Sequence, residues 1–165
     1  MKIEIRKARK GDEKTLAYIQ TQSWKAGFAD ILDEEILSQC TDIKKVTAMY
    51  TSLLDTNRAN GYILSVEHTP HCMAWWAQAR DTAFAGKAEL ICIHSLPDNW
   101  HKGYGRTMME YILKDIQKEG YTQVVLWVFQ DNTRARCFYE SLGFVQTSVS
   151  KSSFHMKEIL YIKNI

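Results

Sequence analysis

The hydrophobic pattern in the second half of the chain predicts a strand, a turn, a helix and another strand in direct succession. Residues 88–93 are mostly apolar, and residues 97–106 form a polar turn that contains two glycines. Helical spacing of apolar residues extends from 107 to 118, and residues 124–129 are again continuously apolar. A continuous apolar run is typical of a strand that is covered on both faces. We therefore expect the two strands to form a short parallel pair around the connecting helix.

The first half of the chain predicts one strand followed by helices. Apolar and polar residues alternate over residues 3–8, which is the period of a half-buried strand. Helical spacing begins after Asp12, which is the expected N-cap. Asp33 precedes a short helix with acidic residues in its first turn, and Asp42 is the expected cap of the helix after it.

The remaining pattern predicts an α/β (α+β) fold with a mixed, mostly antiparallel central sheet of about seven strands. Residues 62–67 and 72–79 have the composition of antiparallel partners, and Asn60-Gly61 is a turn signal before the first of them. Two more strands are expected near the end of the chain. Helices should cover both faces of the sheet. No linker, repeat or charge run divides residues 1–165, so we expect a single domain.

Composition and charge argue against several classes of protein. The chain has 21 basic and 19 acidic residues, a net charge of +2 and 45% hydrophobic residues. This charge is too small for the basic face with which proteins neutralise many phosphates, so no nucleic-acid partner is expected. No apolar run approaches the roughly 18 residues of a membrane span. We expect a cytoplasmic protein without a membrane partner.

The four cysteines and five histidines predict neither a disulfide framework nor a metal site. The cysteines at 40, 72, 92 and 137 form no close pair, which favours reduced thiols. His68 and His71 flank Pro70, but no third metal ligand is near them in the sequence.

The glycine-containing turn is a candidate anion site. Backbone N–H groups without partners and the dipole of the following helix favour a pyrophosphate at such a place. His101, Lys102 and Arg106 add positive charge nearby. A Rossmann site would need a third glycine, and a Walker loop would need Gly-Lys-Ser/Thr; the turn has neither. The turn therefore predicts a pyrophosphate ligand of another kind.

Two blocks of sequence resemble the GNAT superfamily of N-acetyltransferases, in particular its small bacterial members. Residues 96–105 resemble the family's acetyl-CoA loop, usually written Gln/Arg-x-x-Gly-x-Gly/Ala, with Trp100 where Gln or Arg is commonest. The second block, which resembles the helix after the next strand, is Asn132-x-x-Ala135-x-x-Phe138-Tyr139-x-x-x-Gly143-Phe144. The resemblance covers nearly the whole chain, in outline only before residue 87. It implies a GNAT-type sheet that splays at the centre.

The resemblance also implies a reaction and a co-substrate. An acetyl group would pass from acetyl-CoA to a primary amine of a small molecule or peptide, by direct attack in a ternary complex. The implied cofactor-binding residues are Ile93, His94, Ser95, His101, Lys102, Gly103, Tyr104, Gly105, Arg106, Asn132 and Tyr139. A second hypothesis is an acyl-CoA-binding sensor or regulatory domain that has the same site but no turnover.

Three residues are candidates for the proton chemistry. The resemblance implies that Tyr139 protonates or hydrogen-bonds the departing thiolate of coenzyme A. A protonated amine cannot attack a thioester, so a base must take its proton. Glu89 and His94 are the candidates, directly or through a water; the alternatives are a paired carboxylate in the sheet and a hydrogen-bonded histidine at a strand end.

The acceptor pocket is weakly specified. In this fold it is walled by the first helical region and by the second and third strands, which indicates Trp24, Phe28 and Trp75. The alternative is that these aromatic residues belong to the core. Polyamine, aminoglycoside, amino acid and protein N-terminus all remain open as acceptors. The apolar final strand, residues 154–162, is a candidate surface for a homodimer.

Overall fold

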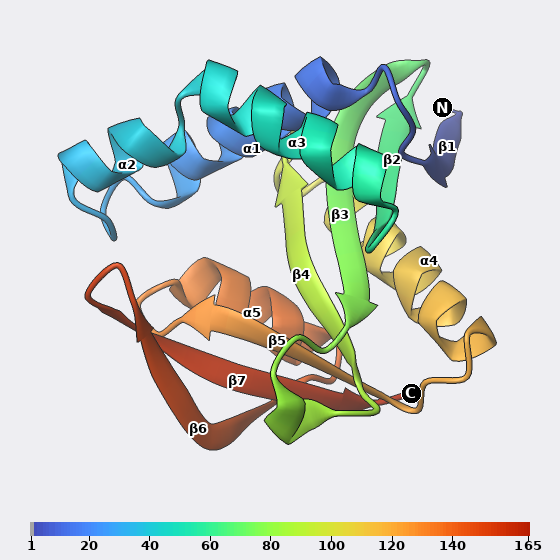
Figure 1. Cartoon of the computed structure of the whole chain (residues 1–165), viewed down its shortest axis with the longest axis vertical. Coiled ribbons are helices and arrows are strands. Elements are labelled where there is room, and N and C mark those ends of the chain that lie inside the picture. Colours follow the sequence, from blue (N-terminus) through green and yellow to red (C-terminus); the bar gives the residue numbers. More distant parts are fainter. Residues whose placement is uncertain (1) are drawn as a thin grey trace.

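Seven strands form one sheet in the computed structural model, which describes residues 2–165 (Figure 1). The strands lie in the order β1-β2-β3-β4-β5-β7-β6, and only β4 and β5 are parallel. The strands are β1 (Ile3–Lys7), β2 (Asn60–Val66), β3 (Thr69–Gln78), β4 (Ala88–Ser95), β5 (Gln123–Phe129), β6 (Val145–Ser153) and β7 (Met156–Asn164). The α-helices are α1 (Glu13–Gly27), α2 (Glu34–Cys40), α3 (Ile43–Thr56), α4 (Tyr104–Lys118) and α5 (Thr133–Ser141). The mixed, mostly antiparallel sheet predicted from the sequence is confirmed.

The parallel pair at the centre of the sheet is short. Only Ala88, Glu89 and Leu90 of β4 have partners in β5, which are Val124, Val125 and Leu126. The register against β3 shifts just beyond this point, with Trp75 opposite Cys92 and Trp76 opposite Leu90, so Ile91 is an extra residue in β4. The two strands then diverge toward their C-terminal ends. Figure 1 shows β5, β7 and β6 running across the molecule, turned away from the upright β2, β3 and β4.

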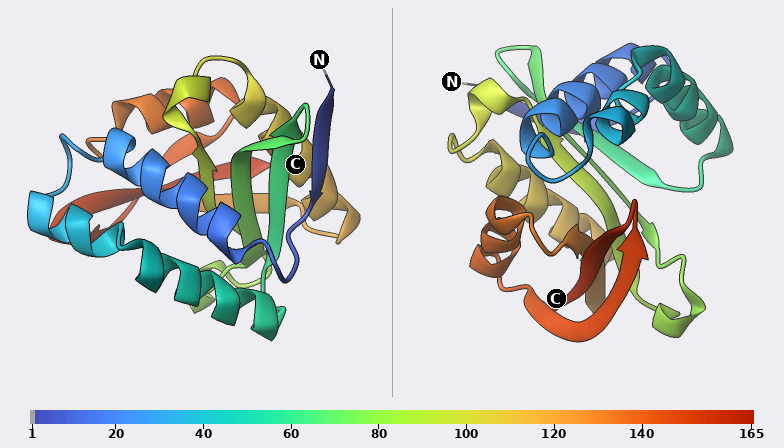
Figure 2. Two further views of the ribbon diagram at one scale, coloured as in Figure 1. Left: turned by 90° about the horizontal axis from the view of Figure 1, so that it is seen from above. Right: turned by 90° about the vertical axis from the view of Figure 1, so that its left-hand side faces the viewer.

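Helices cover both faces of the sheet. On one face, α1 and α3 bury Leu16, Ile19, Val46 and Tyr50 together with Trp75 of β3. On the other face, α4 and α5 pack against the strands, and Figure 2 shows the sheet between these two groups of helices. Full burial of a large apolar side chain stabilises the folded state by roughly 1.5–3 kcal/mol, so both layers hold the sheet from its two sides.

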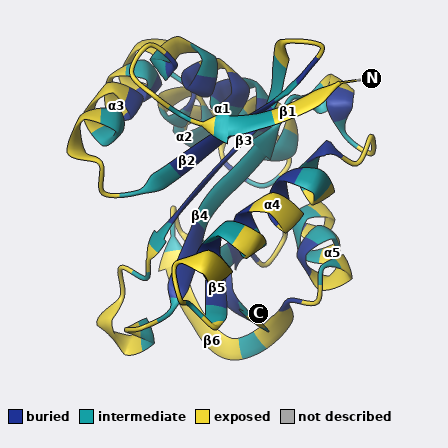
Figure 3. Cartoon of the chain, turned by 90° about the vertical axis from the view of Figure 1, so that its right-hand side faces the viewer, coloured by how far each residue is buried: buried dark blue, intermediate teal, exposed yellow. Residues whose placement is uncertain are grey.

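The long helix α4 has one strongly apolar face. Met108, Met109, Ile112 and Ile116 are fully buried at helical spacing. Figure 3 shows the helix in alternating bands of buried and exposed residues, as expected for a helix that lies on a sheet. The helix begins at Tyr104 and not at residue 107, because Gly103, at φ +85°, ends the preceding loop and serves as its N-cap.

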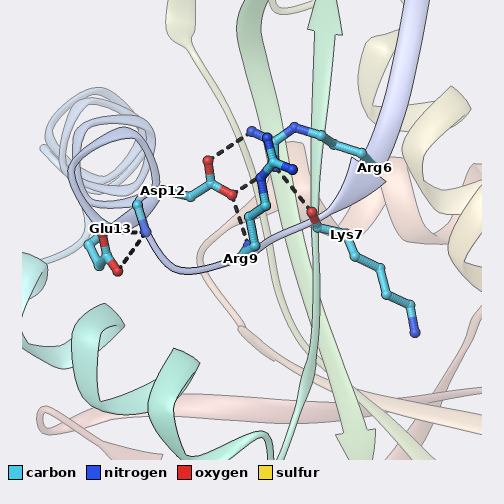
Figure 4. A network of polar contacts seen from close by, with 6 residues as sticks. Arg6, Lys7, Arg9, Asp12 and Glu13 are labelled. Atoms are coloured by element: carbon cyan, nitrogen blue, oxygen red, sulfur yellow. Dashed lines mark hydrogen bonds and ion pairs between the residues drawn. The ribbon is translucent and has the colours of Figure 1, made fainter.

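The expected caps of α1 and α3 have different outcomes. Asp42 caps α3 as predicted, because its carboxylate accepts from the N–H groups of Lys44 and Lys45. The predicted side-chain cap by Asp12 is wrong. Its carboxylate instead accepts two hydrogen bonds from the Arg6 guanidinium, at 2.7 and 2.8 Å, and one from the Arg9 N–H at 2.8 Å (Figure 4). Paired charges of this kind are stronger partners than a helix N–H group, and they tie β1 to the start of α1.

One further prediction from the sequence is corrected. Gly61 does not form a turn but lies in β2, opposite Trp75. A Cβ atom at Gly61 would lie 2.4 Å from the Trp75 ring, so only glycine leaves room for the indole at this position. The final strand has no free edge, because β7 lies between β5 and β6 and buries Ile159, Leu160 and Tyr161, and the homodimer stays a prediction. Among residues 2–165, no helix is long and apolar enough to cross a membrane.

The cap of α3 can be tested by substitution. Asp42→Ala removes both hydrogen bonds to the helix start and should lower the midpoint of thermal unfolding by about 2–4 °C. Asp33→Ala is the matched control, because Asp33 is the N-cap of α2 but its side chain makes no capping bond. Calorimetric melting of both variants measures the difference, and equal shifts would contradict the assigned cap.

Candidate active site

A cavity of about 700 Å³ lies where β4 and β5 diverge. Small-molecule sites in proteins have volumes of roughly 300–1,000 Å³, so the cavity has the size of a ligand site. Its walls come from α1, the ends of β4 and β5, the loop before α4, the start of α5 and the β6–β7 hairpin. The lining includes the predicted residues Ile93, His94, Ser95, His101, Gly103, Tyr104, Gly105, Arg106, Asn132 and Tyr139.

The loop between β4 and α4 is held from both sides. The Trp100 indole N–H donates to the carbonyl oxygen of Ser95 at 3.0 Å. Asn99 contacts the His71 ring and accepts from the Lys102 ammonium at 3.1 Å. The first turn of α4 follows at once, and its N–H groups have no partner within the helix. The loop thus presents the positive end of a helix dipole to the cavity, which favours an anionic group.

Gly105 lets α4 approach α5 closely. A Cβ atom at this position would lie 3.4 Å from the Phe138 ring, in van der Waals contact with it. The two sequence blocks that resemble the GNAT motifs therefore meet in space at Gly105 and Phe138. Lys102, in contrast, is outside the lining of the cavity and donates to Asn99.

Asn132 and Tyr139 bring the second block into the cavity. Asn132 caps α5, because its Oδ1 accepts from the Ala135 N–H at 3.1 Å. Tyr139 is about two helical turns further along α5. Its ring is buried between those of Phe138 and Phe144. Burial raises the pKa of the Tyr139 phenol, and the charge of Arg134 offsets part of this rise. The phenol therefore keeps its proton at neutral pH and is a hydrogen-bond donor.

His94 lines the same cavity from β4. Its Nε2 accepts a hydrogen bond from the Trp24 indole N–H at 3.3 Å, which leaves the proton of a neutral ring on Nδ1. Burial, with the nearby charge of Arg134, lowers the pKa of His94 to about 4. The imidazole is therefore neutral at physiological pH, and its one free electron pair is shared with Trp24.

Glu89 lies outside the lining of the cavity. It is in the part of β4 that still pairs with β5, and its carboxylate accepts from the Arg80 side chain at 2.6 and 3.2 Å. The Arg80 backbone N–H donates a third bond at 3.1 Å. Burial raises the pKa of Glu89, but the bonds and charge of Arg80 outweigh it, so the pKa is lowered overall. The structure thus places Glu89 in an ion pair and not among the residues that line the cavity.

The three aromatic residues expected around the acceptor separate into two groups. Trp24 and Phe28 line the cavity, with their ring centroids 4.8 Å apart, and Phe28 also contacts Phe129 of β5 at 5.5 Å. Trp75 is in the core under α1 and α3, where it packs on Tyr50. The strand alternation of β3 points it away from the opening.

Sequence reasoning missed Arg134, which is part of the cavity lining. Its guanidinium lies over the Trp100 ring, 3.7 Å from the centroid, and reaches the end of α1, where a Cβ on Gly27 would lie 2.9 Å from Nη2. Arg134 is two residues after Asn132, inside the second sequence block, so its place near the site was available from the sequence. Its contact with Trp100 was not, because the two residues meet only through the fold.

Residues 19–144 match the model of the acetyltransferase (GNAT) family. Since the match covers more than half of the chain, the protein belongs to this family, and it is an acyltransferase. The expectation from the two motifs is confirmed, and the family agrees with acetyl-CoA as the co-substrate.

Similar proteins support this assignment. A spermidine N(1)-acetyltransferase from Thermoplasma acidophilum is 27% identical over 159 residues, which cover 96% of this chain and 98% of that protein. A [ribosomal protein bS18]-alanine N-acetyltransferase from Escherichia coli K12 is 31% identical over 68 residues, 41% of this chain and 46% of that one. The crystal structure of the PaiA N-acetyltransferase from T. acidophilum in complex with coenzyme A superimposes with a TM-score of 0.82, covers 100% of both chains and is 24% identical.

The lowered pKa of His94 has a measurable consequence. Between about pH 4 and 6.5 the unfolded chain binds a proton at His94 that the folded protein does not, so this residue lowers stability as the pH falls through that range. In His94→Gln that contribution should disappear, and melting curves from pH 4 to 7 should depend less on pH. NMR titration should show His94 near pH 4. A midpoint near 6.5 would contradict the burial of this ring.

Proposed function

We propose that the protein transfers an acetyl group from acetyl-CoA to a primary amine, by direct attack of the amine on the thioester while both substrates are bound. The observation that carries the proposal is the single cavity that joins the start of α4, suited to a pyrophosphate, with the buried phenol of Tyr139. A cavity lined by both features suits an extended cofactor whose reactive end is far from its phosphates.

The divergence of β4 from β5 supports an extended binding mode for the pantetheine arm. Beyond Leu90, the edge of β4 that faces β5 has no strand partner. Backbone groups of Ile93, His94 and Ser95 can therefore pair with the two amides of the arm, as they would with another strand. The Ser95 carbonyl already accepts from Trp100, so Ile93 and His94 carry most of this pairing.

The pyrophosphate belongs at the start of α4 in this proposal. The backbone of Gly103, Tyr104, Gly105 and Arg106 supplies the N–H groups, and the helix dipole adds to their attraction. His101 and Arg106 line the cavity at this end. In this proposal Asn132 binds the arm near its thiol end. Its Oδ1 accepts the capping hydrogen bond, but its amide N–H groups are still available to a ligand.

Tyr139 serves the leaving group. When the amine nitrogen bonds to the thioester carbon, the C–S bond breaks and negative charge develops on sulfur. A phenol that keeps its proton can donate a hydrogen bond to this sulfur and deliver the proton to it. The raised pKa of Tyr139 ensures that the donor form predominates at neutral pH.

His94 is better placed than Glu89 to accept the amine proton. His94 faces the cavity, whereas Glu89 is engaged by Arg80. The His94 Nε2 electron pair is shared with Trp24, so proton transfer to it requires the Trp24 bond to give way or a water to relay the proton. The positive charge of Arg134 also favours the neutral form of an amine bound beside it.

The alternative is an acyl-CoA sensor without turnover. It has the same cofactor site, so binding alone does not separate the two functions. An assay of thiol release with a panel of amines does, because a sensor releases no thiol above hydrolysis with any of them. Acetyl-CoA binding by calorimetry comes first, and absence of binding at high micromolar ligand would contradict both functions.

The role of Tyr139 gives a direct test. Tyr139→Phe removes only the hydroxyl group, and kcat should fall by roughly 10²–10⁴-fold because a proton donor is lost. The dissociation constant for acetyl-CoA should change little. Tyr18→Phe is the matched control, since Tyr18 is exposed and outside this cavity. Unchanged kcat in Tyr139→Phe would exclude the phenol as the donor.

A further inference from the structure

The cavity contains a positive charge that the protein itself does not neutralise. Arg134 takes part in none of the ion pairs within residues 2–165, which are Arg6–Asp12, Lys10–Asp55, Arg80–Glu89 and Lys151–Glu158. It is an exposed residue in an open cavity, so a ligand can reach it. Stacking on Trp100 holds the guanidinium plane but satisfies none of its five N–H donors.

The other charged groups of the lining are already engaged. The single carboxylate among the lining residues is Glu158, which lies 3.6 Å from the Lys151 ammonium. Arg106 donates to Ser141, at 3.0 Å to Oγ and 3.4 Å to the carbonyl oxygen. Arg134 is thus the lining cation whose charge is most available to a bound anion.

The position of Arg134 associates it with the acceptor side of the cavity. Its Nη2 lies against Gly27 at the end of α1, the helix that carries Trp24 and that Phe28 follows directly. Trp24 of α1 donates a hydrogen bond to His94, so Arg134 and His94 both contact this part of the chain. An anion on Arg134 is therefore close to the attacking amine.

We propose that Arg134 binds a carboxylate of the acceptor, and that the acceptor is a small α-amino acid with an apolar side chain. The inference rests on the proposed acetyl transfer. A guanidinium and a carboxylate form two parallel hydrogen bonds, and Trp100 fixes the plane in which they form. Because Arg134 and Tyr139 both belong to α5 and line the same cavity, the amine and the carboxylate are neighbours in the proposed acceptor. The rings of Trp24, Phe28 and Phe129 then contact its side chain.

The same charges disfavour a polyamine. A long polycation needs carboxylates along its path, and the lining offers only Glu158, which Lys151 neutralises. Arg134 repels any second ammonium group near the reacting one. The proposed acceptor therefore differs from spermidine, which the name of the Thermoplasma acidophilum relative gives as its substrate.

The reaction with this acceptor is balanced without a further reactant. The neutral amine nitrogen bonds to the acetyl carbon, the C–S bond breaks, and the sulfur keeps the electron pair. One amine proton is lost, and one proton reaches the sulfur. The products are the N-acetylamino acid and coenzyme A with a free thiol.

The test measures thiol release by the full chain with acetyl-CoA and three kinds of amine. These are leucine, methionine and phenylalanine; their decarboxylated counterparts, such as phenethylamine; and spermidine. We expect acetylation of at least one of the amino acids, with kcat/KM roughly 10- to 100-fold above its decarboxylated counterpart, as for loss of a hydrogen-bonded charge. Preferred acetylation of spermidine or of decarboxylated amines would overturn the acceptor proposal and leave acetyl transfer intact.

Variants of Arg134 test the contact itself. Arg134→Gln should raise KM for the amino acid by roughly 10- to 100-fold and change kcat/KM for the decarboxylated amine by a much smaller factor. Arg134→Lys keeps the positive charge but cannot form two parallel hydrogen bonds, so its KM for the amino acid should lie between those of the wild type and Arg134→Gln. Arg58→Gln, a change of an exposed arginine on the loop before β2, controls for net charge. An unchanged dissociation constant for acetyl-CoA shows that the variants are folded.

Two results would count against the assignment in different ways. If Arg134→Gln weakens acetyl-CoA and not the amino acid, the guanidinium binds a phosphate of the co-substrate and the acceptor contact is wrong. If acetyl-CoA binds but no amine releases thiol, the proposed transfer fails and the acceptor proposal fails with it.

Discussion

The separation of two parallel strands is the constraint on which the rest of the site depends. β4 and β5 share three paired positions and then diverge, with an extra residue at Ile91. Backbone groups of a strand need partners, so an open edge inside a protein is stable only if a ligand or solvent reaches it. The opening also lies at the C-terminal ends of parallel strands, where the following helices begin. α4 and α5 consequently direct their first turns toward the same space.

The two sides of this opening have different chemistry. At the start of α4, backbone N–H groups and a helix dipole favour phosphate. At the other end, aromatic rings from α1 and β5 line the same cavity as Tyr139 and His94, and burial keeps the phenol protonated and the imidazole neutral. Arg134 lies between these regions as a cation without a carboxylate partner in the described chain. The site therefore combines uncharged proton-transfer groups with one fixed positive charge.

The residues that sequence reasoning placed well are those with local causes. The glycine turn before α4, the cap at Asp42 and the cap at Asn132 depend on neighbours within a few positions. Predictions failed where a distant residue offered a stronger partner. Asp12 bonds Arg6 instead of its own helix, and Gly61 lies in a strand because the Trp75 indole covers it. Glu89 pairs with Arg80 in the same way, and its role as a base stays a prediction.

The sequence by itself determined the order of strands and helices, the glycine turn before α4 and the family, because each depends on periodicity, on local caps or on short motifs. Only the tertiary structure decided which side chains face the opening. A strand exposes alternate residues to opposite faces, and one extra residue at Ile91 exchanges those faces for the remainder of β4. The stacking of Arg134 on Trp100 was likewise decided by the packing of α5 beside the loop, which no local pattern encodes.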